Sequence, residues 1–416
     1  MNFTFVPDPC QQEVIEAEGG NHLVLASPGC GKTQILAERI CRAHENGVDY
    51  ADMLCLTFTN RAARGMTERI ARRMGDKVTG EIFVGNVHRY CSRFLFANGL
   101  VPTESAVIDD DDAVSILARY LGDDEYSVVA NYQRRREYAE VFHLSTFMHQ
   151  IRMKHPKAIR VHSECLDSND IAAMKCICRL QKKDFTPEMM VDMYLHADLY
   201  RSLTRSDTMD YGSQQIVKKM LRKMVLAWEY ERYKRENRLL DFNDLLMFTY
   251  DALASDTTDA PRFHRYRWIQ VDEVQDLNPL QMQIIRLLTA PDALTVMCLG
   301  DEQQAIFSFM GAKMGTLEAL RNREGCCLHH LSVNHRSPEY LLQVFNDYAA
   351  TVLGIDKAML PQPCGDNHAV RLGNELMILR SDNYESEVRD VVQFAVQLNH
   401  NFPHDTTAIV VNANRD

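Results

Sequence analysis

Residues 26–33, with the sequence ASPGCGKT, combine the side-chain types that proteins use to bind phosphate groups. Gly29 and Gly31 allow the backbone to approach a phosphate and to point successive N–H groups at it. Lys32 supplies an ammonium group for the β- and γ-phosphates, and the hydroxyl of Thr33 is a suitable ligand for Mg²⁺. The segment therefore predicts a phosphate-binding loop, although alanine replaces the first glycine of the usual G-x-x-x-x-G-K-[ST] pattern.

A second candidate group is the acidic pair Asp272 and Glu273, which directly follows the apolar run 268–271. An aspartate at the end of a strand can hold Mg²⁺ beside a phosphate loop, and the next glutamate can accept a proton from an attacking water. Adjacent carboxylates are often only a solvated turn. This pair, however, follows a buried strand, and ligands of open α/β sheets bind at the carboxyl ends of strands. The pair therefore predicts hydrolysis of a nucleoside triphosphate.

Short apolar runs and helical patterns alternate around both groups. The run 23–25 is typical of a buried parallel strand, and apolar residues at three-to-four spacing over 35–40 predict a helix after the loop. Further strands are expected at 53–59, 81–84, 268–271 and 294–301. This alternation predicts an α/β protein with a parallel sheet.

The pattern changes along the chain and predicts a division into four segments. Residues 104–235 are helical and mostly polar, which predicts a helical insertion between two halves of the α/β core. Helix and strand alternate again over 338–416, with strands expected at 376–379 and 407–411, as at the start of a second α/β domain. The expected segments are 1–103, 104–235, 236–325 and 326–416.

The composition of the 416 residues is ordinary for a globular protein, and it excludes several classes. No apolar run approaches 18 residues and the N-terminus lacks the regions of a signal peptide, so we expect no membrane span and a cytoplasmic location. The 12 cysteines contain no repeated C-x-x-C pair, which favours reduced thiols over a zinc site. The net charge of −11 argues against extensive polyanion binding but permits a local basic track.

Such a track is present after the second expected strand. Phe58 is followed by a helical pattern with Thr59 or Asn60 as its cap and with five arginines, at positions 61, 64, 69, 72 and 73. A helix N-terminus beside an aromatic ring suits a phosphate backbone with stacked bases. A solvated basic helix face gives the same pattern, so the residues alone leave both interpretations open.

Taken in order, these segments resemble the motifs of the UvrD/Rep/PcrA-like superfamily 1 DNA helicases over essentially the whole chain. The matching segments are PDPCQQ (7–12), ASPGCGKT (26–33), LTFTNRAARGM (56–66), VGNVHRY (84–90), LLDFNDLL (239–246), VDEVQD (271–276), GDEQQAIFSFMGA (300–312) and NHRS (334–337). Alanine at the start of the phosphate loop is normal in that family. The resemblance implies a RecA-like ATP-binding domain 1A (1–103 and 236–325), a helical insertion domain 1B (104–235) and part of a second RecA-like domain 2A (326–416).

The resemblance also implies roles for individual residues in ATP hydrolysis. Catalytic roles fall on Lys32, on Glu273 as general base, on Gln304 as the link between the γ-phosphate and the DNA site, and on Arg336 as an arginine finger from the second domain. Thr33 and Asp272 hold Mg²⁺. Nucleotide-binding positions are Gln11, Ser27, Pro28, Gly29, Cys30, Gly31, Lys32, Thr33, Arg39 and His335.

The implied partner is single-stranded DNA, or DNA with a single-stranded tail. The positions that grip it in the family correspond to Phe58, Thr59, Asn60, Arg61, His88 and Phe309. Three residues depart from the family pattern: Met310 replaces an arginine, His335 replaces a tyrosine that stacks on adenine, and Asn86 replaces a threonine. Motifs V and VI, which carry the second arginine finger, have no match, so we expect slow hydrolysis by this chain alone.

Two functions remain open at this stage. The first is an ATP-dependent DNA helicase or translocase, with 3′–5′ polarity implied only by the family, acting in DNA repair, plasmid replication or phage defence. The alternative is a helicase-like subunit that senses nucleotide and DNA and regulates a partner such as a nuclease. Both require ATP and Mg²⁺.

Overall fold

The computed structural model describes residues 5–75, 81–124, 128, 132–152, 166, 168–205, 209–256, 261–301, 315–365, 377 and 379–410. The chain divides into two compact units, residues 1–364 and 365–416, which are treated separately. In this part of the chain, no helix is long and apolar enough to span a bilayer.

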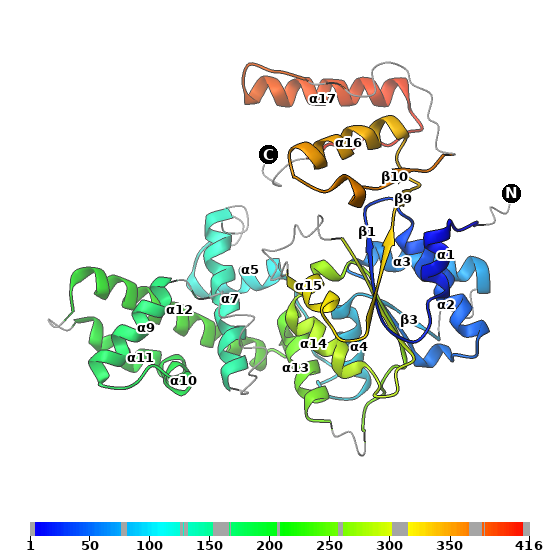
Figure 1. Cartoon of the computed structure of the whole chain (residues 1–416). Coiled ribbons are helices and arrows are strands. Elements are labelled where there is room, and N and C mark those ends of the chain that lie inside the picture. The colour runs from blue at the N-terminus through cyan, green and yellow to red at the C-terminus, as the bar shows by residue number, and fades with distance from the viewer. Residues whose placement is uncertain are drawn as a thin grey trace. The chain divides into compact units, whose positions relative to one another are not determined.

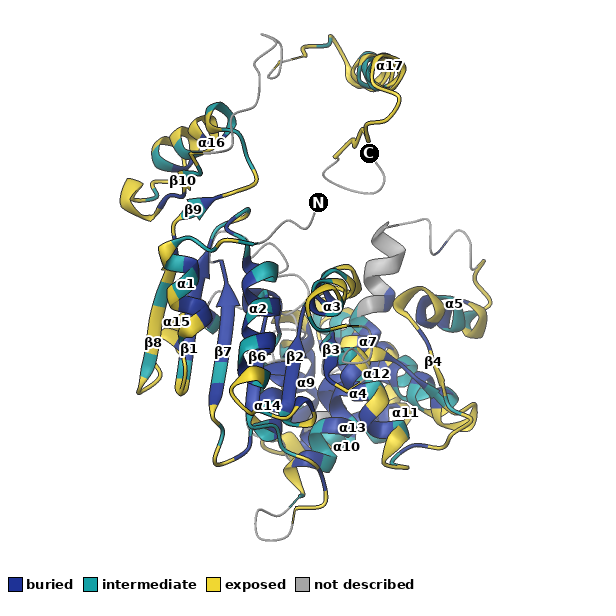
Figure 2. Ribbon diagram, turned by 90° about the vertical axis from the view of Figure 1, so that its right-hand side faces the viewer, coloured by how far each residue is buried: buried dark blue, intermediate teal, exposed yellow. Residues whose placement is uncertain are grey.

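A six-stranded, all-parallel sheet forms the centre of the first unit (Figure 1). Its strands are β1 (Gly20–Ala26), β2 (Met53–Leu56), β3 (Phe83–Gly85), β6 (Trp268–Val271), β7 (Thr295–Gly300) and β8 (Cys326–Leu331). Their order is β3-β2-β6-β7-β1-β8, so β1 and β6 lie on either side of β7. The inner strands are almost wholly buried and the edge strand β8 is largely exposed (Figure 2). This confirms the predicted α/β class with a parallel sheet.

Helices cover both faces of the sheet, which explains why the inner strands are apolar on both sides. One face packs against α1 (Pro9–Glu16), α2 (Lys32–Glu45) and α3 (Asn60–Met74). The other face packs against α4 (Val87–Ala97), α13 (Phe242–Ala254), α14 (Pro279–Leu288) and α15 (Gly315–Arg321). Alternate residues of β1 point to opposite faces of the sheet. Val24 and Ala26 pack on the face covered by α1, α2 and α3, and Leu23 and Leu25 pack on the face covered by α4, α13, α14 and α15.

Local sequence signals set the ends of several of these helices. Asp8 caps α1 and accepts a hydrogen bond from the Gln11 backbone N–H, with Pro9 at the first helical position. Thr59 caps α3 in the same way by accepting from the Ala62 N–H, so the predicted cap is confirmed. Short 3-10 helices occupy Tyr50–Asp52, Arg201–Arg205, Val274–Asp276 and Lys357–Met359.

The segment between α4 and α13 is helical and has a hydrophobic core of its own. It contains α5 (Asp110–Leu121), α7 (Tyr132–Arg152), α9 (Ser168–Gln181), α10 (Pro187–Leu195), α11 (Ala197–Tyr200) and α12 (Tyr211–Glu236), coloured cyan to green in Figure 1. Two short strands, β4 (Ala106–Val107) and β5 (Leu239–Leu240), pair in parallel where the chain enters and leaves it. A helical segment with its own core is therefore inserted between α4 and α13.

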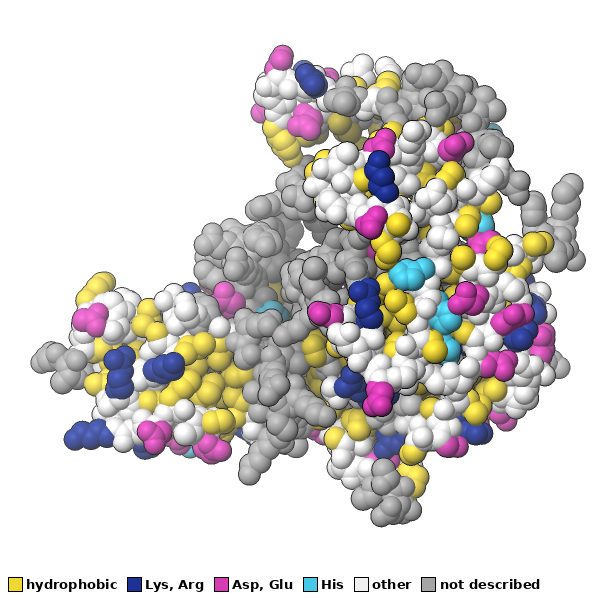
Figure 3. All heavy atoms as spheres, in the orientation of Figure 1, with side chains coloured by type: hydrophobic (Ala, Val, Ile, Leu, Met, Phe, Trp, Pro, Cys, Tyr) yellow, Lys and Arg dark blue, Asp and Glu magenta, His cyan; other side chains and the backbone are white. Residues whose placement is uncertain are grey.

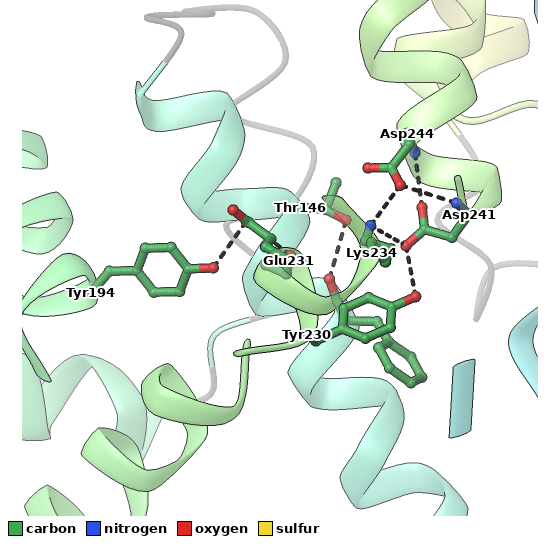
Figure 4. A network of polar contacts seen from close by, with 9 residues as sticks. Thr146, Tyr194, Tyr230, Glu231, Lys234, Asp241 and Asp244 are labelled. Carbon is green, nitrogen blue, oxygen red and sulfur yellow. Dashed lines mark hydrogen bonds and ion pairs between the residues drawn. The ribbon is translucent and has the colours of Figure 1, made fainter. Parts of the chain in front are cut away.

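A buried ionic network joins the last helix of the insertion to α13 (Figure 4). Lys234 of α12 lies between two carboxylates, with Nζ 2.7 Å from Asp241 Oδ2 and 2.6 Å from Asp244 Oδ2. The Tyr230 hydroxyl also donates to Asp241, over 3.0 Å. Asp241 is at the same time the N-cap of α13, so the junction and the helix start depend on the same side chain.

After β8 the chain forms β9 (Val333–Asn334), α16 (Glu339–Thr351) and β10 (Gln362–Pro363), and β9 pairs with β10. Because β8 extends the first sheet, the strand that begins at 326 lies in the sheet of the phosphate loop; the domain boundary expected there stays a prediction. In the second unit, α17 (Tyr384–Asn401) matches a predicted helix.

The strand predicted at 407–411 is wrong for its described residues, because 407–410 are irregular and pair with no other strand. An apolar run becomes a strand only where another strand pairs with it. Of the strand expected at 376–379, residues 377 and 379 are also irregular, and the other two lie outside the described residues.

Candidate functional site

The phosphate loop connects β1 to α2 and depends on two glycines. Gly29 and Gly31 have φ angles of 87° and 81°, in the left-handed region that side chains rarely adopt. A Cβ atom on Gly29 would lie 2.7 Å from Asn334 Nδ2, and one on Gly31 would lie 2.8 Å from Gln11 Nε2. The loop then enters the first turn of α2 at Lys32, where backbone N–H groups have no acceptor within the helix. This arrangement is an anion site of the kind that binds phosphates.

Lys32 connects the loop to the acidic pair. Its side chain is buried, and Nζ lies 3.2 Å from the backbone oxygen of Ala26 and 3.2 Å from Glu273 Oε1. The two residues are 241 positions apart, yet β1 and β6 bring them to the same edge of the sheet. The predicted meeting of a phosphate-binding lysine and a carboxylate at the carboxyl ends of the strands is therefore present.

Asp272 and Glu273 lie in different environments. Asp272 is 3% exposed, and burial, reinforced by the charge of Glu273, raises its pKa to about 7. Glu273 is partly exposed and has a left-handed backbone with a φ of 51°, which is strained for a non-glycine residue. Gln275 holds it by donating from Nε2 to Glu273 Oε2 over 2.8 Å, while Oε1 of Gln275 accepts from the Asp301 N–H.

The donor set beside the loop suits Mg²⁺ bound together with a nucleotide. Across the residues that the structure describes, no group of three or more histidine, cysteine or acidic side chains is placed to hold a metal by itself. Mg²⁺ in nucleotide sites uses one or two carboxylates and takes its other ligands from phosphates and water. Thr33 at the start of α2 and Asp272 fit that scheme. The buried Oδ1 of Asp276 has no hydrogen-bond partner in the described part of the chain, and burial raises the pKa of Asp276 to about 6.

Gln11 and His335 border the loop from opposite ends of the sequence. Gln11 is 1% exposed; its Nε2 donates to the backbone oxygen of Cys30 over 3.1 Å, and its Oε1 accepts from the Asp8 N–H. The backbone N–H of His335 donates to the backbone oxygen of Gly29, and its ring lies 2.9 Å from the carboxylate of Asp8. Both residues are therefore brought to the loop, but Gln11 supports the loop backbone with the amide that is expected to contact adenine.

The residues expected to bind DNA begin where β2 ends. Phe58 is half-buried against the core, whereas Thr59, Asn60 and Arg61 are exposed around the N-terminus of α3. Asn60 accepts a hydrogen bond of 3.1 Å from Asn86, the N-cap of α4, so the two helix N-termini are linked. An exposed pair of helix N-termini beside an aromatic ring is suited to phosphate groups of a nucleic acid.

His88 is the second residue of α4 and is partly buried. Burial lowers its pKa to about 4, so the ring is neutral at physiological pH. The ring centroid is 5.2 Å from that of Phe242 on α13. His88 can therefore offer stacking or a neutral hydrogen bond to a ligand, but no charge.

Comparison with known proteins identifies the family to which this chain belongs. Residues 8–324 match the profile of the UvrD/REP helicase N-terminal domain. The match covers both strands of the nucleotide site and the helical insertion. The chain belongs to the UvrD/REP helicase family.

Curated relatives of the same family agree in name. "ATP-dependent DNA helicase UvrD1" of Mycobacterium leprae is 26% identical over 363 residues, which is 83% of this chain and 40% of the relative. "DNA helicase II" of Escherichia coli is 27% identical over 343 residues, or 81% and 39%. A "Probable DNA helicase" of Mycoplasma pneumoniae is 24% identical over 415 residues, or 97% and 67%. The chain thus spans about 40% of the length of most of these relatives.

Arg39, which the resemblance places among the nucleotide-binding positions, contacts the end of α1 in this structure. This side chain is 3% exposed, and its guanidinium donates to the backbone oxygen of Ala17 over 2.8 Å and to Gln270 Oε1 over 3.2 Å. It also contacts carbonyl oxygens at the end of α1. Arg39 therefore holds the end of α1 against α2. Its expected contact with the nucleotide stays a prediction.

Sequence reasoning missed two positioning residues. Asn334 donates from Nδ2 to the backbone oxygen of Pro28 over 2.8 Å, and its Oδ1 accepts from the N–H groups of Arg336 and Ser337. It therefore links the backbone of Arg336 to the phosphate loop, whereas the resemblance implies that Arg336 belongs to the second domain. Gln275 is the second missed residue. Gln275 could have been found from its place in the VDEVQD segment. Asn334 could have been found because asparagine side chains often accept hydrogen bonds from the backbone in turns.

Two predicted site residues, Gln304 and Phe309, lie outside the described residues, as does Met310. The phosphate-loop positions Ser27, Pro28, Gly29, Cys30, Gly31, Lys32 and Thr33 are described and lie together between β1 and α2. The phosphate loop and the N-termini of α3 and α4 therefore all follow strands of one sheet, β1, β2 and β3.

Proposed function

We propose that this chain forms the nucleotide-binding part of an ATP-dependent DNA helicase or translocase that couples ATP hydrolysis to 3′–5′ movement along single-stranded DNA. The observation that carries the proposal is the contact of Lys32 with Glu273 beside buried Asp272, at the carboxyl ends of β1 and β6. Family membership supports ATP and DNA as ligands. The polarity, a cytoplasmic location and a part in DNA repair rest on the resemblance in sequence.

In this proposal each residue of the site has a separate role in ATP hydrolysis. Lys32 and the backbone N–H groups of the loop bind the phosphates, while Thr33 and Asp272 hold Mg²⁺, whose charge stabilises the γ-phosphate during transfer. Glu273 accepts a proton from the attacking water. Arg336, held to the loop through Asn334, places a guanidinium near the transferred group.

The remaining expected roles belong to recognition. Gln11 and His335 contact the adenine, and Gln304 connects the γ-phosphate with the DNA site. The DNA contacts proposed for this chain are Phe58, Thr59, Asn60, Arg61, His88 and Phe309. Closure and opening around ATP then change the grip on stacked bases, and this moves the strand.

The substitution Glu273→Gln tests the central assignment. We expect ATP to bind as in the parent chain and the rate of hydrolysis to fall by about 10²–10⁴, the usual contribution of a general base. Equilibrium titration with a fluorescent ATP analogue and a phosphate-release assay with single-stranded DNA measure the two quantities. Glu324→Gln, an exposed glutamate in the turn before β8, is the matched control. Turnover that persists in Glu273→Gln would reject Glu273 as the base.

A strand-displacement assay separates the proposal from the alternative of a regulatory subunit. Since motifs V and VI have no match in these 416 residues, we expect the chain alone to bind ATP and DNA but to hydrolyse ATP slowly. If the chain changes the activity of a nuclease partner in response to ATP and DNA, but no strand is unwound with or without that partner, the regulatory subunit is supported instead.

A further inference from the structure

A groove lies beside the edge strand β3, and of its lining residues only Asn60 has a role in the proposal above. It lies between α3 and α4, which both contact β3, and has a volume of about 700 Å³. In Figure 2 the labels of these three elements lie side by side. The polar residues that line it are Asn60, Arg64, Thr67, Glu68, Arg89 and Arg93. We call this surface the arginine groove.

The arginine groove is positively charged in a chain whose net charge is −11. Arg64, Arg89 and Arg93 are all exposed, and the structure assigns none of them an ion pair with another described residue. Its one acidic residue, Glu68, lies 3.9 Å from Arg72, which is not among the lining residues. On the face drawn in Figure 3, by contrast, basic and acidic side chains are interspersed.

The three guanidinium groups come from two walls and are arranged for a linear anion. Arg89 and Arg93 are one turn apart on α4, so they project from one face of the helix with an axial separation of about 6 Å. The Arg93 guanidinium lies over the ring of Phe83 at 5.9 Å from the centroid, which limits its freedom. Arg64 projects from α3, on the opposite wall. Successive, planar donors of this kind bind phosphate groups through paired hydrogen bonds.

One end of the groove coincides with the proposed DNA contacts. Asn60 lines the groove and is also the first residue of α3, next to Thr59 and Phe58. Its hydrogen bond to Asn86 connects the N-termini of α3 and α4, and both helix dipoles favour a negative charge there. A nucleic-acid strand held at Asn60 can therefore continue into the groove without leaving positive surface. This continuity favours a nucleic-acid backbone over an acidic peptide.

We propose that the arginine groove binds the phosphodiester backbone of the single strand beyond the nucleotides held at Phe58–Arg61. The inference rests on the proposed function, because it extends the DNA site of that function. Arg64, Arg89 and Arg93 neutralise successive phosphates, so the groove adds affinity without reading the base sequence. The groove therefore raises the affinity for long oligonucleotides but not for short ones that end at Asn60.

The triple variant R64Q/R89Q/R93Q tests the proposal on the full chain. Fluorescence anisotropy with an oligothymidylate of about 16 nucleotides gives the association constant from about 50 to 200 mM salt. Each lost phosphate contact lowers the slope of log K against log salt by about 0.7, so we expect the slope to decrease in magnitude by about 2. Binding of an oligothymidylate of about 5 nucleotides and of the ATP analogue should stay within twofold of the parent values.

Two further variants isolate the effect of charge at this place. R179Q/R222Q/R286Q removes three exposed arginines from α9, α12 and α14, and should leave the slope unchanged. R64K/R89K/R93K keeps the charges and should retain most of the slope. Circular dichroism and thermal unfolding check that each variant is folded.

The outcomes distinguish the groove from the function on which it rests. If the 16-nucleotide strand binds the parent chain but the glutamine variant shows the same salt slope, the groove proposal is overturned and the DNA site stands. If neither oligothymidylate binds the parent chain while ATP does, both proposals fail. If the glutamine variant keeps its DNA slope but loses affinity for polyglutamate, the groove belongs to an acidic protein partner and the nucleic-acid assignment is rejected.

Discussion

At the scale of single residues, Gly29 of the phosphate loop lies where neighbouring atoms leave no room for a side chain. Gly29 and Gly47 have nearly the same φ angle, 87° and 92°, but their surroundings differ. A Cβ on Gly29 would meet Asn334 and Arg336 at under 3 Å, whereas nothing lies within 4 Å of one on Gly47. A substitution at Gly47 therefore adds backbone strain alone, whereas one at Gly29 adds both backbone strain and a steric clash.

We predict that Gly29→Ala lowers ATP affinity by at least tenfold, whereas Gly47→Ala leaves it unchanged. Both substitutions place alanine at a positive φ and carry a similar strain of about 1–2 kcal/mol. Only Gly29→Ala also displaces Asn334, which holds the loop and Arg336. Titration with a fluorescent ATP analogue, together with the unfolding temperature of each variant, provides the measurement. Equal affinities in the two variants would show that the contact with Asn334 does not matter.

At the scale of elements, the ion pairs that join α12 to α13 could not be predicted from the sequence. The motif LLDFNDLL was recognised from its order along the chain, but the sequence does not show that its two aspartates share Lys234, seven residues before the first of them. Nothing in the local pattern of α12 marks Lys234 as buried, because exposed lysines in helices are common. The contact depends on where the insertion returns to the core.

We predict that Lys234→Met destabilises the protein by about 3–5 kcal/mol, because it leaves two buried carboxylates without a counter-charge. Lys219→Met, at an exposed position of the same helix, should change stability by less than about 0.5 kcal/mol. Urea denaturation followed by circular dichroism compares the two. A Lys234→Met variant as stable as the control would show that the network contributes nothing to the junction.

The same network predicts a dependence of stability on pH. Burial, with the neighbouring charge of Asp241, raises the pKa of Asp244 to about 6, above the value of an unfolded aspartate. Between about pH 4 and pH 6 the folded state binds the extra proton, so the contribution of Asp244 to stability decreases as the pH rises through this window. Asp244→Asn, which has no proton to lose, should flatten this part of the profile. Unfolding midpoints measured every half pH unit give the comparison, with exposed Asp198→Asn as control.

At the scale of the whole molecule, sequence periodicity predicted most of the first sheet but not the details that depend on distant contacts. The strand at 268–271 and the cap Thr59 follow from local patterns, and the structure has them as expected. The contacts of Arg39 could not be predicted, because its partners, the carbonyl groups at the end of α1, are brought to it only when the chain folds. The strand expected at 407–411 failed for a similar reason, since pairing cannot be read from one segment.

The parallel sheet makes the stability of the first unit depend on its ligand, because β1, β6 and their loops meet only in the folded state. We predict that ATP with Mg²⁺ stabilises the chain by about 2.7 kcal/mol when its free concentration is 100 times the dissociation constant. Chelating the Mg²⁺ should remove most of this effect in the parent chain. Asp272→Asn should lose the Mg²⁺-dependent part and keep the part due to ATP alone, because Lys32 and the loop remain. Thermal unfolding with and without chelator measures both parts, and a variant that responds to Mg²⁺ like the parent would exclude Asp272 as its ligand.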